Sequence, residues 1–271
     1  MSEIKVGCIG CGTMGGALIK AMAKKIGGNN IYVSSKNPEH ASSFAKEIGV
    51  NACQTNVQVA EKSDYIFIGV KPAYVESVLD ELNDFASSGK VFISMAAGIS
   101  LETLQNSLMG MQGAKFVRIM PNLPAVFQEG MTAICYDEKN ISAEKIQIIK
   151  KLLETAGKAE IVPEKLMDAV TAVSGSGPAY AFMFIEALAD AAVRFGMPRK
   201  QAYIYAAQTL KGAAVMALKD DRSISQLKDA VCSPAGTTIE AVVSLEKNGF
   251  RSSIIEAASA AYQKSLELKN K

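Results

Sequence analysis

A glycine-rich hexapeptide near the amino terminus is the first candidate for chemistry. Its residues are Gly10, Cys11, Gly12, Thr13, Met14 and Gly15. It follows an apolar run and opens a helix-like segment, the context in which Gly-x-Gly-x-x-Gly binds a dinucleotide. Gly12 lets pyrophosphate approach the backbone, and the free N–H groups of the following helix face the phosphates. The hexapeptide therefore predicts a dinucleotide site, with an ordinary tight turn as the alternative.

The end of the second apolar run distinguishes between the two nicotinamide dinucleotides. An NAD site usually has Asp or Glu there, which binds the ribose hydroxyls. Here the run ends in hydroxyl residues and a cation, because Ser35 and Lys36 follow Val33 and Ser34. These groups can hold a 2′-phosphate, so NADPH is favoured as the cofactor and NADH is possible. A solvated Lys36 is the alternative.

A loop of hydroxyl residues near the carboxyl terminus is the second candidate. It contains Ser233, Gly236, Thr237 and Thr238, together with Pro234. A helix start that carries free N–H groups and hydroxyls can bind a carboxylate. Capping of the helix is the alternative, but a cap explains only one of the hydroxyls. The loop therefore predicts a site for an anionic small-molecule substrate.

The chain lacks the acid that many hydroxy-acid dehydrogenases use. Its single histidine, His40, follows the second apolar run, near the adenosine end of the predicted cofactor site. β-Hydroxyacid dehydrogenases carry lysine and asparagine after a glycine turn, and the comparable positions here hold Ala181 and Phe184. An imine needs less acid–base help, because it is readily protonated to an iminium that accepts hydride. We therefore favour an imine reductase; a β-hydroxyacid-dehydrogenase-like oxidoreductase and a non-catalytic NADP-binding sensor are the alternatives.

The order of apolar and amphipathic segments predicts the elements that position these residues. Strands are predicted at Ile4–Ile9, Ile31–Val33, Tyr65–Val70, Val91–Met95, Phe116–Met120, Thr132–Cys135 and Ala159–Val162. Helices are predicted between them, for example at Met14–Ile26, Pro72–Phe85 and Ser142–Ala156, with Ser142 as an N-cap. This alternation is typical of a parallel sheet covered on both faces.

From Glu164 onward the sequence predicts helices only. They cover Pro178–Phe195, Arg199–Leu218, Ile224–Val231, Thr237–Lys247 and Ser252–Leu268. The predicted fold class is α/β, with a Rossmann-type dinucleotide-binding domain at residues 1–163 and an all-helical domain at residues 164–271. A helical segment of this length makes a thin core. Its small residues therefore pack either within the domain or in a subunit interface.

The composition excludes several function classes. Of the 271 residues, 49% are hydrophobic and 21% are charged, as in globular proteins. A net charge of +2 does not suit nucleic-acid binding. No apolar run reaches the roughly 18 residues of a membrane span, and the amino terminus lacks a signal-peptide pattern, so a cytoplasmic location is expected. The five scattered cysteines predict no disulfide framework and no metal site, despite the spacing of Cys8 and Cys11.

Several longer segments resemble the pyrroline-5-carboxylate reductase family. The two most specific are Asp168–Tyr180, which reads DAVTAVSGSGPAY, and Gln226–Thr238, which reads QLKDAVCSPAGTT. The glycine hexapeptide and the segments Val70–Pro72, Met95–Gly98 and Met120–Asn122 are also similar to that family. The resemblance spans the chain in order and implies reduction of 1-pyrroline-5-carboxylate to L-proline by NADPH or NADH, the last step of proline biosynthesis.

The resemblance also implies roles for individual residues. Cofactor contacts are implied at Asn56, Val70, Lys71, Pro72 and Ala97. Substrate contacts are implied at Ser233, Gly236, Thr237 and Thr238, and we expect Thr238 to be the catalytic residue, at the ring nitrogen. Glu164 either faces the substrate of a partner subunit or is a surface carboxylate. The helical domain is expected to form a homodimer or a larger ring of dimers.

Overall fold

The first part of the chain forms one mostly parallel sheet. The computed structural model describes residues 4–107 and 114–269, without the side chains of residues 86–88 and 269. The sheet has eight strands in the order β3-β2-β1-β4-β5-β6-β7-β8. In chain order they are β1 (Val6–Ile9), β2 (Ile31–Ser34), β3 (Asn51–Ala52), β4 (Tyr65–Ile68), β5 (Val91–Ser94), β6 (Lys115–Met120), β7 (Gly130–Tyr136) and β8 (Gly157–Ile161). This doubly wound order confirms the predicted Rossmann-type sheet.

Strand β7 departs from the predicted parallel sheet. It runs antiparallel to β6, whereas β8 is again parallel to β7. The connection from β6 to β7 contains only a short 3₁₀ turn at Leu123–Phe127. A parallel crossover needs about a dozen residues or more, usually with a helix, so this connection can only reverse the chain. The two-residue strand β3 was not predicted, because it is too short to show a periodic pattern.

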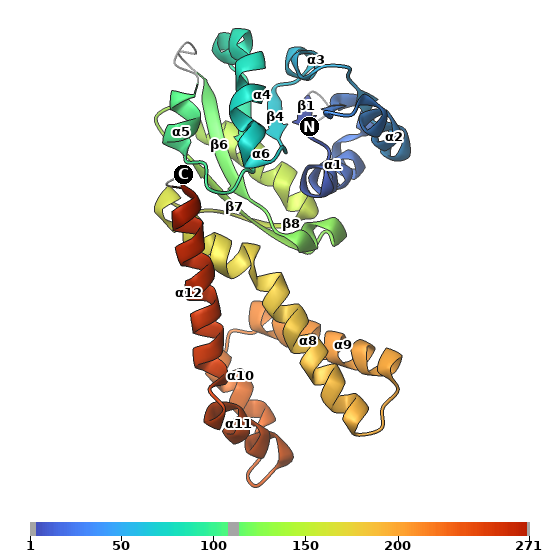
Figure 1. Cartoon of the computed structure of the whole chain (residues 1–271), viewed down its shortest axis with the longest axis vertical. Coiled ribbons are helices and arrows are strands. Elements are labelled where there is room, and N and C mark those ends of the chain that lie inside the picture. Colours follow the sequence, from blue (N-terminus) through green and yellow to red (C-terminus); the bar gives the residue numbers. More distant parts are fainter. Residues whose placement is uncertain (1–3, 108–113, 270–271) are drawn as a thin grey trace. The chain divides into compact units, whose positions relative to one another are not determined.

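Helices cover both faces of this sheet (Figure 1). One face packs against α1 (Thr13–Ile26), α2 (Pro38–Ile48) and α6 (Ala143–Leu153). The other packs against α3 (Asn56–Lys62), α4 (Val75–Glu81), α5 (Leu101–Asn106) and α7 (Met167–Val170). Alternate residues of a strand serve alternate faces. In β4, for example, Phe67 belongs to the first core cluster and Ile66 to the second.

Two helix predictions need different bounds. The helix predicted at Pro72–Phe85 is α4 alone, with 3₁₀ turns on both sides, at Pro72–Tyr74 and Asn83–Ser88. The α-helix ends because the Leu82 N–H donates to the Leu79 carbonyl, which is the tighter 3₁₀ spacing common at helix ends. The helix after Ser142 likewise ends in a 3₁₀ turn. Ser142 caps it as predicted, because its hydroxyl accepts from the Lys145 N–H at 3.5 Å.

The boundary between the two packed units does not lie after Pro163, where it was predicted. Among the described residues, the first unit extends to Ser176 and also includes the chain from Ala261 onward. The second unit is Gly177–Ala260. Residues after Pro163 join the first unit because Met167 lies in its core and buried Asp168 accepts a hydrogen bond from Ser265 at 2.7 Å.

The second unit contains helices only. They are α8 (Gly177–Arg194), α9 (Arg199–Lys219), α10 (Ile224–Val231), α11 (Thr237–Lys247) and the first part of α12 (Phe250–Lys269). α8 and α9 pack side by side around a small cluster of Ala189, Ala202 and Ala206 (Figure 1). No helix in residues 4–107 or 114–269 combines the length and hydrophobicity that crossing a membrane requires.

Candidate active site

A cleft of about 480 Å³ opens where β1, β2 and β4 end. Gly10, Ser35, Lys36, Asn56 and Val70 all line it. These predicted cofactor residues come from distant parts of the sequence, and the carboxyl ends of neighbouring parallel strands bring them together. Doubly wound sheets bind their ligands at this edge.

The glycine hexapeptide has the geometry that a pyrophosphate requires. Gly10 has φ +92°, which favours glycine, and a Cβ at Gly15 would lie 2.3 Å from the Gly10 carbonyl oxygen. A Cβ at Gly12 would meet no atom within 4 Å, so the space above this residue is open. Helix α1 begins with Thr13 and Met14, and no side chain caps it. Its first N–H groups are therefore available to an anion, and the residues present fit a dinucleotide.

Cys11 has a buried side chain in this loop, and its cofactor contact stays a prediction. Its side chain is only 2% exposed, and its Sγ lies 3.7 Å from Nδ1 of His40. Burial raises the pKa of the Cys11 thiol and also that of Cys8. Both cysteines therefore stay protonated near neutral pH, when a thiol is a poor nucleophile and metal ligand.

The cleft also contains residues that the sequence did not reveal. They are Gln54, Thr55, Tyr74, Ser77 and Glu81. Tyr74, Ser77 and Glu81 recur at intervals of three and four, which places them on one side of the segment that contains α4. The spacing shows that the three residues share one side, and only the fold shows that this side faces the cleft. The Nζ of Lys36 lies 5.3 Å from the centre of the Tyr74 ring, a cation–π contact that holds the lysine at the cleft.

Lys71, Pro72 and Ala97 lie at the same edge of the sheet without lining this cleft. Lys71 and Pro72 follow β4 and start a 3₁₀ turn. Ala97 follows β5 and packs against the second core cluster. The sequence-based cofactor roles of these three residues stay predictions.

A π-helical turn at Thr171–Gly175 lies beside the end of β6. The Nδ2 of Asn122 donates to the Ser174 carbonyl at 3.1 Å, and its Oδ1 accepts from the Met131 N–H at 2.8 Å. One side chain therefore joins the edge of the sheet to this turn. π-Helical turns are frequent at functional sites, and the conformation places the Ser-Gly-Ser segment at the edge where β6 ends.

A free surface carboxylate was one of the two alternatives for Glu164, and the structure shows an ion pair there instead. Its Oε1 lies 3.3 Å from Nη1 of Arg118, a side chain in β6 that is 1% exposed. The same oxygen accepts from the Leu101 N–H at 2.7 Å. Among the described residues, Nε and Nη2 of Arg118 have no hydrogen-bond partner. The contact of Nη1 with Glu164 therefore provides the negative charge that this buried cation needs. Arg118 was missed, although an arginine within an apolar strand demands such a partner.

The hydroxyl loop of the second unit forms a tight turn before α11. The Gly236 N–H donates to the Ser233 carbonyl at 3.0 Å, and Ala235 between them has φ +57°. Proline at the second position and a positive φ at the third are the features of a type II turn. A Cβ at Gly236 would lie 2.3 Å from the Ser233 hydroxyl oxygen, so a larger residue there would displace the Ser233 side chain.

The start of α11 remains uncapped by side chains. The hydroxyls of Ser233, Thr237 and Thr238 therefore do not cap the helix, which was the alternative explanation for them. The N–H of Gly236, one of the residues with an implied substrate contact, donates within the turn and is not free for a carboxylate. The N–H groups of Thr237 and Thr238 in the first helical turn are the ones that can receive an anion.

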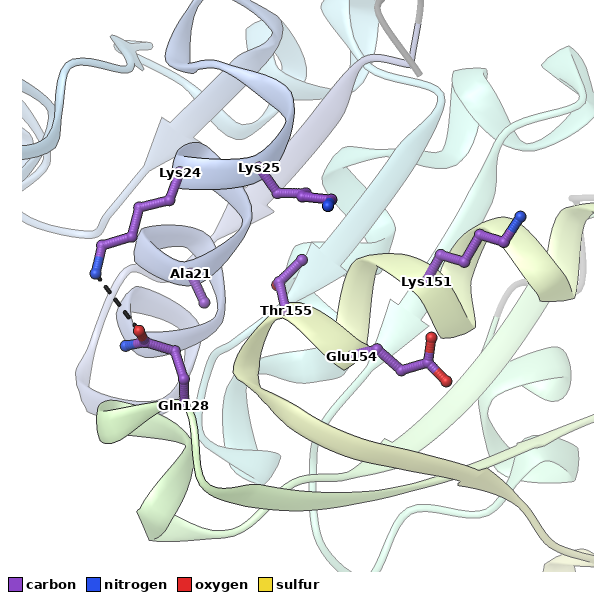
Figure 2. A pocket seen from close by; sticks show the side chains of 7 residues that line it. All are labelled: Ala21, Lys24, Lys25, Gln128, Lys151, Glu154 and Thr155. Carbon is purple, nitrogen blue, oxygen red and sulfur yellow. Dashed lines mark hydrogen bonds between the residues drawn. The ribbon is translucent and has the colours of Figure 1, made fainter.

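A second cleft of about 480 Å³ has a structural explanation. Figure 2 shows Lys24, Lys25 and Lys151 around it, with Gln128, Glu154, Ala21 and Thr155. The lysines belong to the last turns of α1 and α6, where cations complement the negative end of the helix dipole. None of the residues predicted to be functional lines this cleft.

Comparisons with known proteins decide the family. Residues 164–268 match the family described as pyrroline-5-carboxylate reductase dimerisation, and residues 5–98 match the family described as NADP oxidoreductase, coenzyme F420-dependent. The chain is 40% identical to the pyrroline-5-carboxylate reductase of Escherichia coli over 268 residues, which cover 98% of each protein. The chain belongs to the pyrroline-5-carboxylate reductase family. It is therefore an NAD(P)H-dependent oxidoreductase of proline biosynthesis.

Solved structures agree over the full length. The Coxiella burnetii pyrroline-5-carboxylate reductase has a TM-score of 0.91 at 31% identity, covering 98% of both chains. The Plasmodium falciparum pyrroline carboxylate reductase, solved with NADP bound, has a TM-score of 0.88 at 33% identity, covering 99% of both chains. These similarities confirm the predicted fold class and family.

Proposed function

We propose that this protein reduces 1-pyrroline-5-carboxylate to L-proline with NADPH bound in the cleft at the end of β1, β2 and β4. The open space above Gly12 beside the uncapped start of α1 is the observation that carries the cofactor assignment. The NADP in the Plasmodium falciparum relative supports it. When bound, the cofactor supplies a hydride to the imine carbon.

The hydroxyl loop provides the second half of the proposal. The N–H groups of Thr237 and Thr238 and the Ser233 hydroxyl hold the substrate carboxylate, since this helix start has no capping side chain. The Thr238 hydroxyl bonds the ring nitrogen and orients the iminium. Glu164 fixes Arg118, and its contact with the substrate of a partner subunit stays a prediction, as does the cytoplasmic location.

Turnover tests this function directly. Adding 1-pyrroline-5-carboxylate should make the absorbance of NADPH fall, with one proline formed for each NADPH consumed. A protein that binds NADPH and leaves the imine unchanged would instead support the non-catalytic sensor.

Replacement of Lys36 by glutamate tests the cofactor preference. Lys36→Glu should raise the KM for NADPH at least about tenfold, because a carboxylate repels the 2′-phosphate, and should change the KM for NADH little. Initial rates with both cofactors decide it. Equal effects on the two Michaelis constants would mean that Lys36 does not face the phosphate.

The second unit is proposed to form a homodimer, which can assemble further into a ring of dimers. Residues 164–268 match the family's dimerisation region. Within the described residues, three alanines are the only buried cluster of this unit, whereas Met183 and Ile204 are more than 60% exposed. Apolar surface of this kind is stable in water when a partner covers it.

A charge in this surface should dissociate the dimer. Ile204→Glu should raise the dissociation constant at least about a hundredfold, because the interface would bury an unpaired carboxylate. Gln147→Glu adds the same charge on the exposed side of α6, in the first unit, and should leave the mass unchanged. Light scattering of the full chain measures both. A wild-type chain that is monomeric at micromolar concentration would overturn the dimer.

A further inference from the structure

The cofactor cleft contains a carboxylate that the glycine hexapeptide and the end of β2 do not supply. Glu81 ends α4 and is the one acid among the cleft-lining residues in the described part of the chain. Its Oε2 accepts a hydrogen bond from Nδ2 of Asn56 at 2.8 Å. The Oδ1 of Asn56 accepts from the Ser34 hydroxyl at 2.7 Å. A chain of three side chains therefore connects the end of β2 with the end of α4.

These two hydrogen bonds determine how the Asn56 amide faces the cleft. A carboxylate only accepts, so Glu81 requires the amide nitrogen of Asn56 to point toward it. The amide oxygen then faces Ser34, whose hydroxyl donates. An amide nitrogen has two N–H donors, and Glu81 uses one of them. The second N–H of Asn56 remains for a ligand.

Charge in the cleft is balanced between one cation and one acid. Lys36 is the cation, and Glu81 is the acid. In dinucleotide sites an acid accepts hydrogen bonds from ribose hydroxyls, and a carboxylate repels a 2′-phosphate. The end of β2 lacks such an acid, but the fold brings one to the same cleft from α4.

We propose that Glu81 is a positioning residue for Asn56 and that its charge lowers the preference for the dinucleotide that carries a 2′-phosphate. NADH thereby stays usable beside NADPH. The inference rests on the proposed function, because it takes the cleft as the cofactor site.

Replacement of Glu81 by glutamine separates its charge from its hydrogen bond. The glutamine oxygen still accepts from Asn56, but the negative charge is gone. Glu81→Gln should therefore lower the KM for NADPH about three- to tenfold, the size of a screened interaction between a carboxylate and a phosphate across a cleft. The KM for NADH and kcat should stay near their wild-type values.

Two further variants test the positioning role. Glu81→Ala removes the charge and also the acceptor that holds the Asn56 amide, so the Michaelis constants for both cofactors should be several-fold higher than in Glu81→Gln. Glu76→Gln removes the same charge from the exposed first turn of α4, outside the cleft, and should change neither constant.

Calorimetric titration with NADP⁺ and NAD⁺ keeps this test independent of turnover. An unchanged ratio of the two dissociation constants in Glu81→Gln would overturn the effect of the charge, and identical behaviour of Glu81→Ala and Glu81→Gln would overturn the positioning role. A wild-type chain that binds neither dinucleotide would overturn the proposed function itself.

Discussion

Thr238→Ala is expected to lower kcat/KM for 1-pyrroline-5-carboxylate about ten- to a hundredfold. A hydrogen bond to a charged group contributes about 1.5–3 kcal/mol, and about 1.4 kcal/mol corresponds to a factor of ten. The half-buried Thr238 side chain lies in the first turn of α11, which no side chain caps, so its hydroxyl is free to contact the substrate. Steady-state rates with saturating NADPH measure the effect.

Two controls separate this role from a structural one. Thr238→Ser keeps the hydroxyl and should retain most of the activity, and the dissociation constant for NADPH should hardly change in either variant. The thermal unfolding midpoint should also stay close to that of the wild type. If Thr238→Ala reduces the imine at the wild-type rate, or loses activity only by losing NADPH or stability, Thr238 does not contact the substrate.

Glu164→Ala is expected to lower the free energy of unfolding by about 3 kcal/mol, because it leaves the Arg118 cation buried without a partner. This value is at the low end for a broken buried ion pair, since the Glu164 side chain is 31% exposed. The Leu101 N–H also loses its acceptor. Urea denaturation followed by circular dichroism measures the loss.

Removing the cation should reverse the effect. Arg118→Met takes the charge out of the core at similar volume, so the double variant Arg118→Met/Glu164→Ala should regain most of the lost stability. A double variant as unstable as Glu164→Ala would show that the ion pair is not the cause. If the double variant is stable but has a raised KM for the imine, Glu164 also contacts the substrate.

Local signals in the sequence determined the fold class and most of its elements. The glycine hexapeptide directly after an apolar run predicted β1, its turn and α1, because these residues interact with near neighbours in the chain. Alternating apolar runs predicted the central strands, and Ser142 predicted the start of α6. Such features can be predicted from the sequence alone, because the contacts that produce them join residues only a few positions apart.

The sequence predicted only part of the loop before α11. Its hydroxyls and the helix that follows them were predicted from residue types, whereas the absence of a capping side chain was seen only in the structure. The turn that uses the Gly236 N–H depends on a positive φ at Ala235, which residue type does not predict, because alanine rarely adopts that conformation.

Only the tertiary structure decided which distant side chains meet. Glu81 reaches Asn56 across 25 residues, Glu164 reaches Arg118 across 46, and Ser265 reaches Asp168 across 97. The two residues of each pair lie on different elements. They meet only because the fold brings those elements together. The periodic pattern of a segment shows which of its sides is buried, but the partner on that side is chosen by packing of the whole unit. That is why the sequence predicted a cofactor cleft and could not show the acid within it.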